Sequence, residues 1–200
     1  QIPLIQMRND ALGNLLGADV PAVRRAAAQG LGGFKDYKKQ AVPMLIGSIG
    51  PNLKEPEVVE AIFQGLAELN DENALPTAHR YFEDKEAKIA SAALLAAGKI
   101  AGSHRIPGTV DLILDLMKKY DKIDSQKDGG GAYGTNIPGG GDDPKRKLAK
   151  DVLPNAIKAM QVVAKEKYTT FKEWQIWWNK YKATFKPEKP LPTGQHTLAL

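Results

Sequence analysis

Val23-Arg-Arg-Ala-Ala-Ala-Gln-Gly-Leu-Gly-Gly-Phe34 is the stretch that decides the fold, because its pattern returns twice later in the chain. The later copies are Val58-Val-Glu-Ala-Ile-Phe-Gln-Gly-Leu-Ala-Glu-Leu69 and Ile89-Ala-Ser-Ala-Ala-Leu-Leu-Ala-Ala-Gly-Lys-Ile100. Each copy has apolar residues at its first and last positions and small residues at its fourth and eighth, which places them on one stripe of a helix. Self-similarity at such an interval predicts stacked helical repeats.

A second short apolar segment with an early proline follows each copy. These segments are Ala41-Val-Pro-Met-Leu-Ile46, Ala74-Leu-Pro-Thr-Ala78 and Ile106-Pro-Gly-Thr-Val110. Proline is tolerated in the first turn of a helix, because its missing N–H would have no partner there. We therefore predict helix pairs at 20–33 with 40–49, 56–69 with 73–83, and 86–101 with 106–120. A segment at 4–16 is expected to be the second helix of a partial repeat that precedes them.

The repeats resemble the HEAT-like helical repeats of bacteria, a class that also occurs in phycobilisome lyase subunits. The resemblance rests on Asp19-Val-Pro-Ala-Val-Arg-Arg-Ala-Ala-Ala-Gln-Gly-Leu-Gly32, on the Ala41–Ile46 segment, and on the two later copies, and it covers residues 4–120. It implies an all-α protein, a right-handed α-solenoid of about four helix pairs. Alanine and glycine on one face let neighbouring helices approach, and no pair buries its apolar face alone.

The charge is distributed unevenly along the chain. Residues 1–144 carry 16 Lys and Arg against 19 Asp and Glu, whereas residues 145–200 carry 12 against 4. Between the two parts, residues 124–143 hold seven of the 19 glycines, a composition typical of a flexible loop. We predict HEAT-like repeats at 1–123, a flexible Gly-rich loop at 124–143, a basic helix pair that caps the solenoid at 144–185, and a Pro-rich extended tail at 186–200.

Two helices are expected after the glycine-rich segment. Asp143 and Pro144 can begin the first, which runs to about residue 164 with a kink or a break at Pro154. Thr170-Phe-Lys-Glu173 is a capping-box pattern that opens the second, which runs to about residue 184. Its aromatic stripe consists of Phe171, Trp174, Trp178, Tyr181 and Phe185. We expect this stripe to dock on helix 144–164, and Trp177, at its edge, to be partly exposed and to anchor a partner.

The residues that most enzyme chemistry needs do not form recognisable patterns. The chain has no cysteine, which excludes disulfides, thiol nucleophiles and thiolate metal sites. His79, His104 and His196 have no ligand partner at a metal-binding spacing, and neither a nucleophile elbow nor a phosphate-binding loop is present. We therefore expect no catalytic residue, no cofactor and no bound metal.

The sequence favours a non-catalytic protein–protein interaction scaffold, an accessory subunit of a larger assembly. It would bind protein partners through the solenoid surface, the glycine-rich loop and the tail. Two alternatives stay open: a nucleic-acid-binding or repair-type HEAT-like protein, and a lyase- or chaperone-like helper of a pigment-binding protein. The excess of acidic residues over the repeats argues against a basic nucleic-acid groove. The expected partner-binding residues are Trp177, His79, Arg80, Tyr81, Lys118, Lys119, Tyr133, Lys145, Arg146 and Lys147.

The first residue is Gln1, so we expect a chain processed by removal of a signal peptide and exported to the periplasm or the exterior, with a cytoplasmic location as the alternative. The longest nearly apolar stretch, Ile89 to Gly98, is much shorter than the roughly 18 residues that a membrane-spanning helix needs. Peripheral association with a membrane complex is compatible with both observations.

Overall fold

Helices form all the repeating secondary structure that the described part of the chain contains. The computed structural model describes residues 2–125 and 143–186, with side chains for 6–123 and 143–186. The helices are α1 (Ile2–Leu15), α2 (Pro21–Gly32), α3 (Lys38–Ile49), α4 (Pro56–Leu69), α5 (Leu75–Arg80), α6 (Ala87–His104), α7 (Pro107–Ser125), α8 (Pro144–Ala164) and α9 (Phe171–Tyr181). No strand occurs in these ranges, and the predicted all-α class is confirmed. None of the described helices is both long and apolar enough to cross a membrane.

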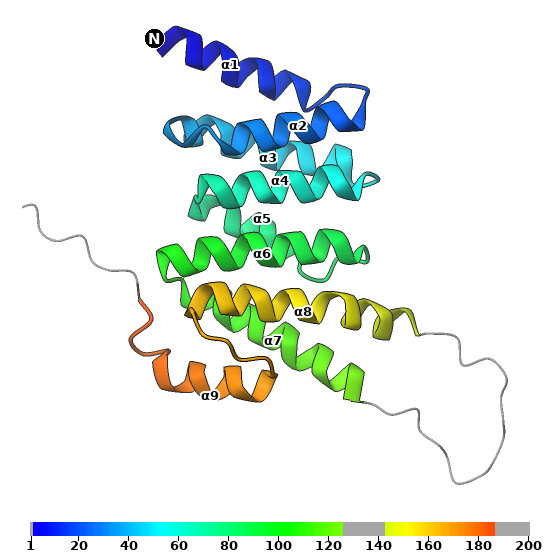
Figure 1. The fold of residues 1–200 in the computed structure, drawn as a ribbon, viewed down its shortest axis with the longest axis vertical. Helices are drawn as coiled ribbons and strands as arrows, with labels where there is room; N and C mark the ends of the chain where they lie inside the picture. The colour runs from blue at the N-terminus through cyan, green and yellow to red at the C-terminus, as the bar shows by residue number, and fades with distance from the viewer. Residues whose placement is uncertain (1, 126–142, 187–200) are drawn as a thin grey trace, which may run out of the picture.

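The helices stack in two layers, as expected for a solenoid (Figure 1). Successive first helices α2, α4, α6 and α8 pack against one another and form the first-helix layer. The second-helix layer contains α3, α5, α7 and α9, in which α5 and α9 both contact α7. Helix α1 packs on both α2 and α3, the contacts expected of a second helix from a preceding repeat. The predicted solenoid of stacked helix pairs is therefore confirmed.

Small residues bring the first helices close together. A Cβ atom on Gly65 of α4 would lie 2.8 Å from the carbonyl oxygen of Ala28 in α2, and one on Gly32 would lie 2.8 Å from the Cα of Gly65. Between α6 and α8, a Cβ on Gly98 would lie 2.8 Å from the Cβ of Ala159. Real Cβ atoms do not approach other atoms so closely, so these helix pairs depend on residues that lack one.

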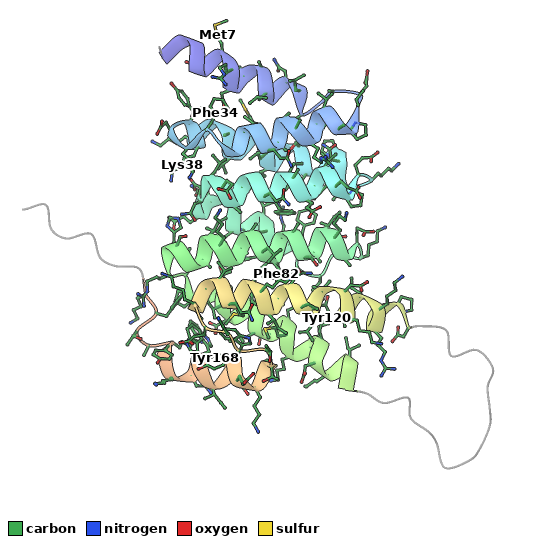
Figure 2. The ribbon with its side chains drawn as sticks, viewed as in Figure 1. Met7, Phe34, Lys38, Phe82, Tyr120 and Tyr168 are labelled. Carbon is green, nitrogen blue, oxygen red and sulfur yellow. The ribbon has the colours of Figure 1, made fainter. Side chains whose placement is uncertain are left out.

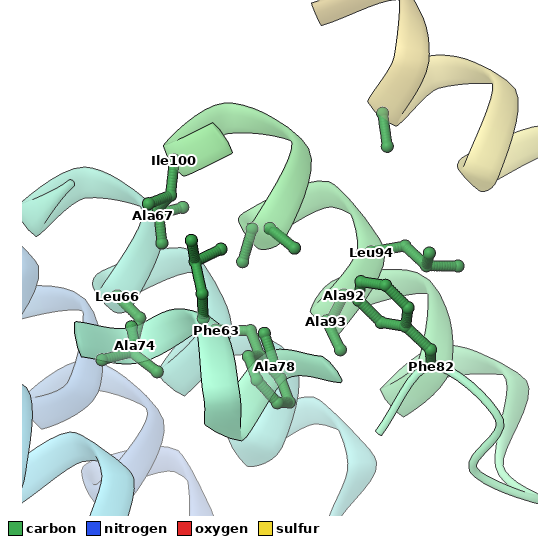
Figure 3. Close-up of a cluster of buried hydrophobic side chains, with 14 of the residues drawn as sticks. Phe63, Leu66, Ala67, Ala74, Ala78, Phe82, Ala92, Ala93, Leu94 and Ile100 are labelled. Atoms are coloured by element: carbon green, nitrogen blue, oxygen red, sulfur yellow. The ribbon is translucent and has the colours of Figure 1, made fainter. Parts of the chain in front are cut away.

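Larger apolar side chains are buried between the two layers, and Figure 2 shows the described side chains on the ribbon. Phe63 and Leu66 of α4 and Leu94 and Ile100 of α6 have no more than 1% of their surface exposed. Figure 3 shows these side chains together with alanines of α5 and α6 and with Phe82, which follows α5. Burial of this apolar surface is the main force that holds the pairs together.

Three local predictions differ from the structure. Pro43 lies inside α3, not in its first turn, because the helix begins at Lys38. The second helix of the middle repeat is only six residues long, since the chain forms a 3-10 turn before it and leaves the helix at Tyr81. Helix α8 continues past Pro154 without a break, because only one backbone hydrogen bond is lost at an exposed residue.

The C-terminal helix begins as predicted but docks elsewhere. The capping box of Thr170 and Glu173 is present. We expected the aromatic stripe to lie on helix 144–164, yet α9 packs mainly against α7. The indole Nε1 of Trp178 donates a hydrogen bond of 2.7 Å to Oδ1 of Asp111 in α7. The hydrogen bond from Trp178 to Asp111 therefore favours α7 as the neighbour of α9. The apolar periodicity of α9 alone does not identify this neighbour.

We expect Gly98→Ala to destabilise the protein by about 1–3 kcal/mol, because the added methyl group overlaps Ala159 of α8. Gly47→Ala is the matched control, since Gly47 is exposed inside α3 and a Cβ there meets nothing within 4 Å. That change should stabilise the protein by roughly 0.5–1 kcal/mol through helix propensity. Urea unfolding measures both, and equal effects of the two substitutions would contradict the close-packing account.

Candidate partner-binding surface

The second-helix layer carries two neighbouring grooves that flank α7. The first groove, between α5 and α7, has a volume of about 490 Å³ and is lined by His79, Arg80, Phe82, Glu83, Leu112, Asp115, Leu116 and Lys119. The second, between α7 and α9, has a volume of about 390 Å³ and is lined by Asp111, Leu114, Asp115, Lys118, Phe171, Gln175, Trp178, Asn179 and Lys182. We call the exposed residues between them, Leu112, Asp115, Lys118 and Lys119, the α7 ridge.

His79 ties α5 to α7 at the floor of the first groove. Its Nε2 lies 3.0 Å from the hydroxyl of Thr109, which is fully buried in α7. The imidazole also meets the ring of Phe82 edge-on, with a centroid separation of 5.3 Å. Burial lowers the pKa of His79, because the charged form loses hydration. His79 therefore holds two second helices together and lines the groove, where its burial favours the uncharged imidazole.

Charged side chains of both signs surround the first groove. Lys119 of α7 forms an ion pair with Glu83, which follows α5, and both side chains are more than half exposed. Arg80 is exposed and donates a hydrogen bond of 3.3 Å from Nη2 to the hydroxyl of Thr77. Leu112 is 43% exposed at the edge of the same groove. The surface thus combines an apolar contact with a polar surround, the usual composition of a protein-binding patch.

The wall of the second groove depends on Asp111. Its Oδ1 accepts hydrogen bonds from Nε1 of Trp178 at 2.7 Å and from Nζ of Lys182 at 2.8 Å. Trp178 is only 4% exposed, so its N–H needs an acceptor inside the protein. Asp111 therefore positions α9 beside α7.

The structure brings together four of the predicted partner-binding residues. His79, Arg80 and Lys119 line the first groove, and Lys118 lines the second. Tyr81 lines neither, because its partly buried ring packs against Phe63 at 5.7 Å.

The other predicted residues lie apart from the grooves. Lys145, Arg146 and Lys147 belong to the first turn of α8, in the other layer, and Tyr133 lies outside the described residues. The expected partial exposure of Trp177 is wrong: it is 8% exposed. Its indole stacks on Trp178 and meets Phe185 edge-on, and it lines a separate cavity of about 660 Å³ beside Arg105.

Sequence reasoning missed Leu112, Asp115 and Glu83. The sequence does contain a signal for Leu112, because this residue lies outside the buried stripe of Val110, Ile113 and Met117 in the same helix. An apolar residue outside the core stripe is a candidate contact. In the described part of the chain, no three His, Asp or Glu side chains gather in an arrangement that would hold a metal ion.

Asp111→Ala should destabilise the protein by about 1–3 kcal/mol, because the buried N–H of Trp178 loses its acceptor. Asp111→Asn keeps an acceptor oxygen at the same place and should destabilise the protein less than Asp111→Ala does. Since all three tryptophans lie on α9, unfolding in urea followed by tryptophan fluorescence reports on this contact directly. Wild-type stability in Asp111→Ala would show that α9 is held by apolar contacts alone.

The stability of the protein should depend on pH through His79. Because its pKa is lowered from an ordinary 6.5, the unfolded chain takes up this proton more readily than the native protein. The stabilisation is therefore fully present above pH 6.5 and is lost as the pH falls towards the native pKa. Thermal unfolding of wild type and His79→Gln between pH 5 and pH 8 tests this. The loss of thermal stability at low pH should be smaller in His79→Gln than in wild type. Parallel pH dependences of the two proteins would contradict the role given to His79.

Comparison with known proteins supports the repeat architecture. Residues 9–98 match the family model of HEAT repeats, a match that begins in α1 and ends inside α6. No curated protein matches the chain. Helices α7, α8 and α9 lie beyond the matched residues but continue the same two layers. This match shows that residues 9–98 are HEAT repeats, and the stacked helix pairs of the described residues agree with a HEAT-like repeat architecture.

Proposed function

We propose that the chain is a non-catalytic scaffold, an accessory subunit of a larger assembly, and that it holds a protein partner along the α7 ridge. HEAT repeats commonly mediate protein–protein interaction, which supports the general class. The observation that carries the specific proposal is the pair of grooves on either side of one helix. A partner segment laid across α7 would enter both grooves at once.

The chemistry of the ridge favours a protein over a nucleic acid. Leu112 supplies an apolar contact at the edge of the first groove, and Asp115 borders both grooves. Lys118 and Lys119 lie one helical turn further along the same face. Phosphate backbones select continuous positive charge, whereas alternating charge around an apolar centre is typical of protein interfaces.

Two further parts of the proposal rest on sequence alone. The glycine-rich segment 124–143 and the tail 186–200 lie almost entirely outside the described residues, and we propose that they add contacts to the same assembly. Export of the chain after removal of a signal peptide is proposed on the same basis. Association of the assembly with a membrane through other subunits is compatible with it.

Leu112→Glu should weaken capture of the partner by about tenfold or more, because it places a charge where the apolar anchor docks. The matched control is Leu53→Glu, since Leu53 is 42% exposed against 43% for Leu112 and lies away from both grooves. Tagged full-length chains recover partners from the source organism, and quantitative mass spectrometry compares the two variants with wild type. Equal losses in both variants, or recovery of nucleic acid in place of protein, would contradict the proposal.

A further inference from the structure

Two lysines of α6 pair with glutamates of α4 on the solvent-exposed side of these two first helices. Nζ of Lys88 in α6 lies 3.0 Å from Glu57 and 3.9 Å from Glu60, both in α4. Nζ of Lys99 lies 2.5 Å from Glu68 at the other end of the same two helices. The Lys88–Glu57 and Lys99–Glu68 pairs join residues 31 apart, the same interval that separates the second and third sequence repeats. An acidic first helix therefore stacks beside a basic one.

Helix α8 is also basic, and α6, the first helix beside it, carries no acidic residue. Residues 144–164 contain five basic residues and one acidic residue, Asp151. Lys147, Lys150 and Lys158 are exposed along the helix, and Lys165 is exposed at its C-cap. No carboxylate of the described residues forms an ion pair with any of these four lysines. We call them the α8 lysine edge.

The α8 lysine edge points away from the existing stack. Asn155 donates a hydrogen bond to Ser91 of α6, and Ala159 touches Gly98, so these residues mark the side of α8 that faces α6. At 100° per residue, Lys150 lies about 180° around the helix from Ala159, and Lys147 and Lys158 lie about 100–120° from it. The edge therefore borders the position where one more first helix would stack.

Apolar residues adjoin the lysines on the same side. Leu153 and Ile157 are only partly buried, although both pack against the core. The segment after α8 covers part of this side, where Nε2 of Gln161 donates to the carbonyl oxygen of Tyr168 at 3.1 Å. Helix α9 then packs on α7 in the second-helix layer (Figure 1). The first-helix layer thus ends at α8 with a side that is both apolar and cationic.

We propose that this side of α8 docks an acidic amphipathic helix of a partner protein, which extends the first-helix layer as α4 does beside α6. Carboxylates of that helix pair with the α8 lysine edge, and its apolar residues cover Leu153 and Ile157. A polyphosphate chain would satisfy the lysines but would leave the apolar residues uncovered, which favours a helix. This surface is distinct from the α7 ridge, which lies on the second-helix layer.

A synthetic peptide with the sequence of residues 55–70 is a suitable probe, because it carries Glu55, Glu57, Glu60 and Glu68 on an amphipathic helix of this type. Fluorescence anisotropy with the full-length chain at low salt measures its binding. The double variant Lys150→Glu/Lys158→Glu should bind the peptide about tenfold or more weakly. Lys39→Glu/Lys54→Glu changes the net charge equally at exposed lysines elsewhere and should bind within about twofold of wild type.

Four results would overturn the proposal. The first is no detectable binding of the peptide, and the second is equal binding of a peptide whose glutamates are replaced by glutamine. The third is equal loss in the two double variants. The fourth is tighter binding of a single-stranded oligonucleotide, or of phosphatidylserine-containing vesicles, through Lys150 and Lys158.

Circular dichroism checks that both double variants fold. Leu112→Glu should bind the peptide as wild type does, so this test and that of the proposed function can fail independently.

Discussion

Close approach between successive first helices is the constraint on which the rest of the structure depends. Gly32, Gly65 and Gly98 stand where a Cβ would overlap a neighbouring backbone or a neighbouring alanine. With the helices this close, the large side chains of α4 and α6 are directed between the layers and become fully buried. Interiors of proteins are close-packed, so a spacing set by small residues at one contact determines which side chains fit at the next.

The two layers differ in regularity. The outer face of α4 and α6 is joined by Lys–Glu pairs at a constant interval. The second helices vary in length from the six residues of α5 to the 19 of α7. Grooves form on both sides of α7, where α5 and α9 are its shorter neighbours. The two grooves proposed to bind a partner therefore lie where the second helices differ most in length.

The candidate site was predictable from the sequence only in part. The position of His79, Arg80, Lys118 and Lys119 on second helices predicts a shared surface, and they do line the two grooves. The position of Trp177 at the edge of the aromatic stripe predicts exposure, yet Trp178 and Phe185 pack around it and bury it. Helical periodicity gives the direction of a side chain from its own helix. It does not say which neighbour covers that direction.

By itself the sequence determined the repeats, most of the helix boundaries and the small-residue stripe, because these depend on local backbone preferences and on periodicity within one helix. Only the tertiary structure decided that α9 docks on α7 through Asp111 and Trp178 and that His79 reaches Thr109. Tertiary structure also left Lys147, Lys150 and Lys158 of α8 without an ion pair to any carboxylate of the described residues. These outcomes depend on pairs of residues up to 67 positions apart, and contacts at such separations arise only when the layers pack.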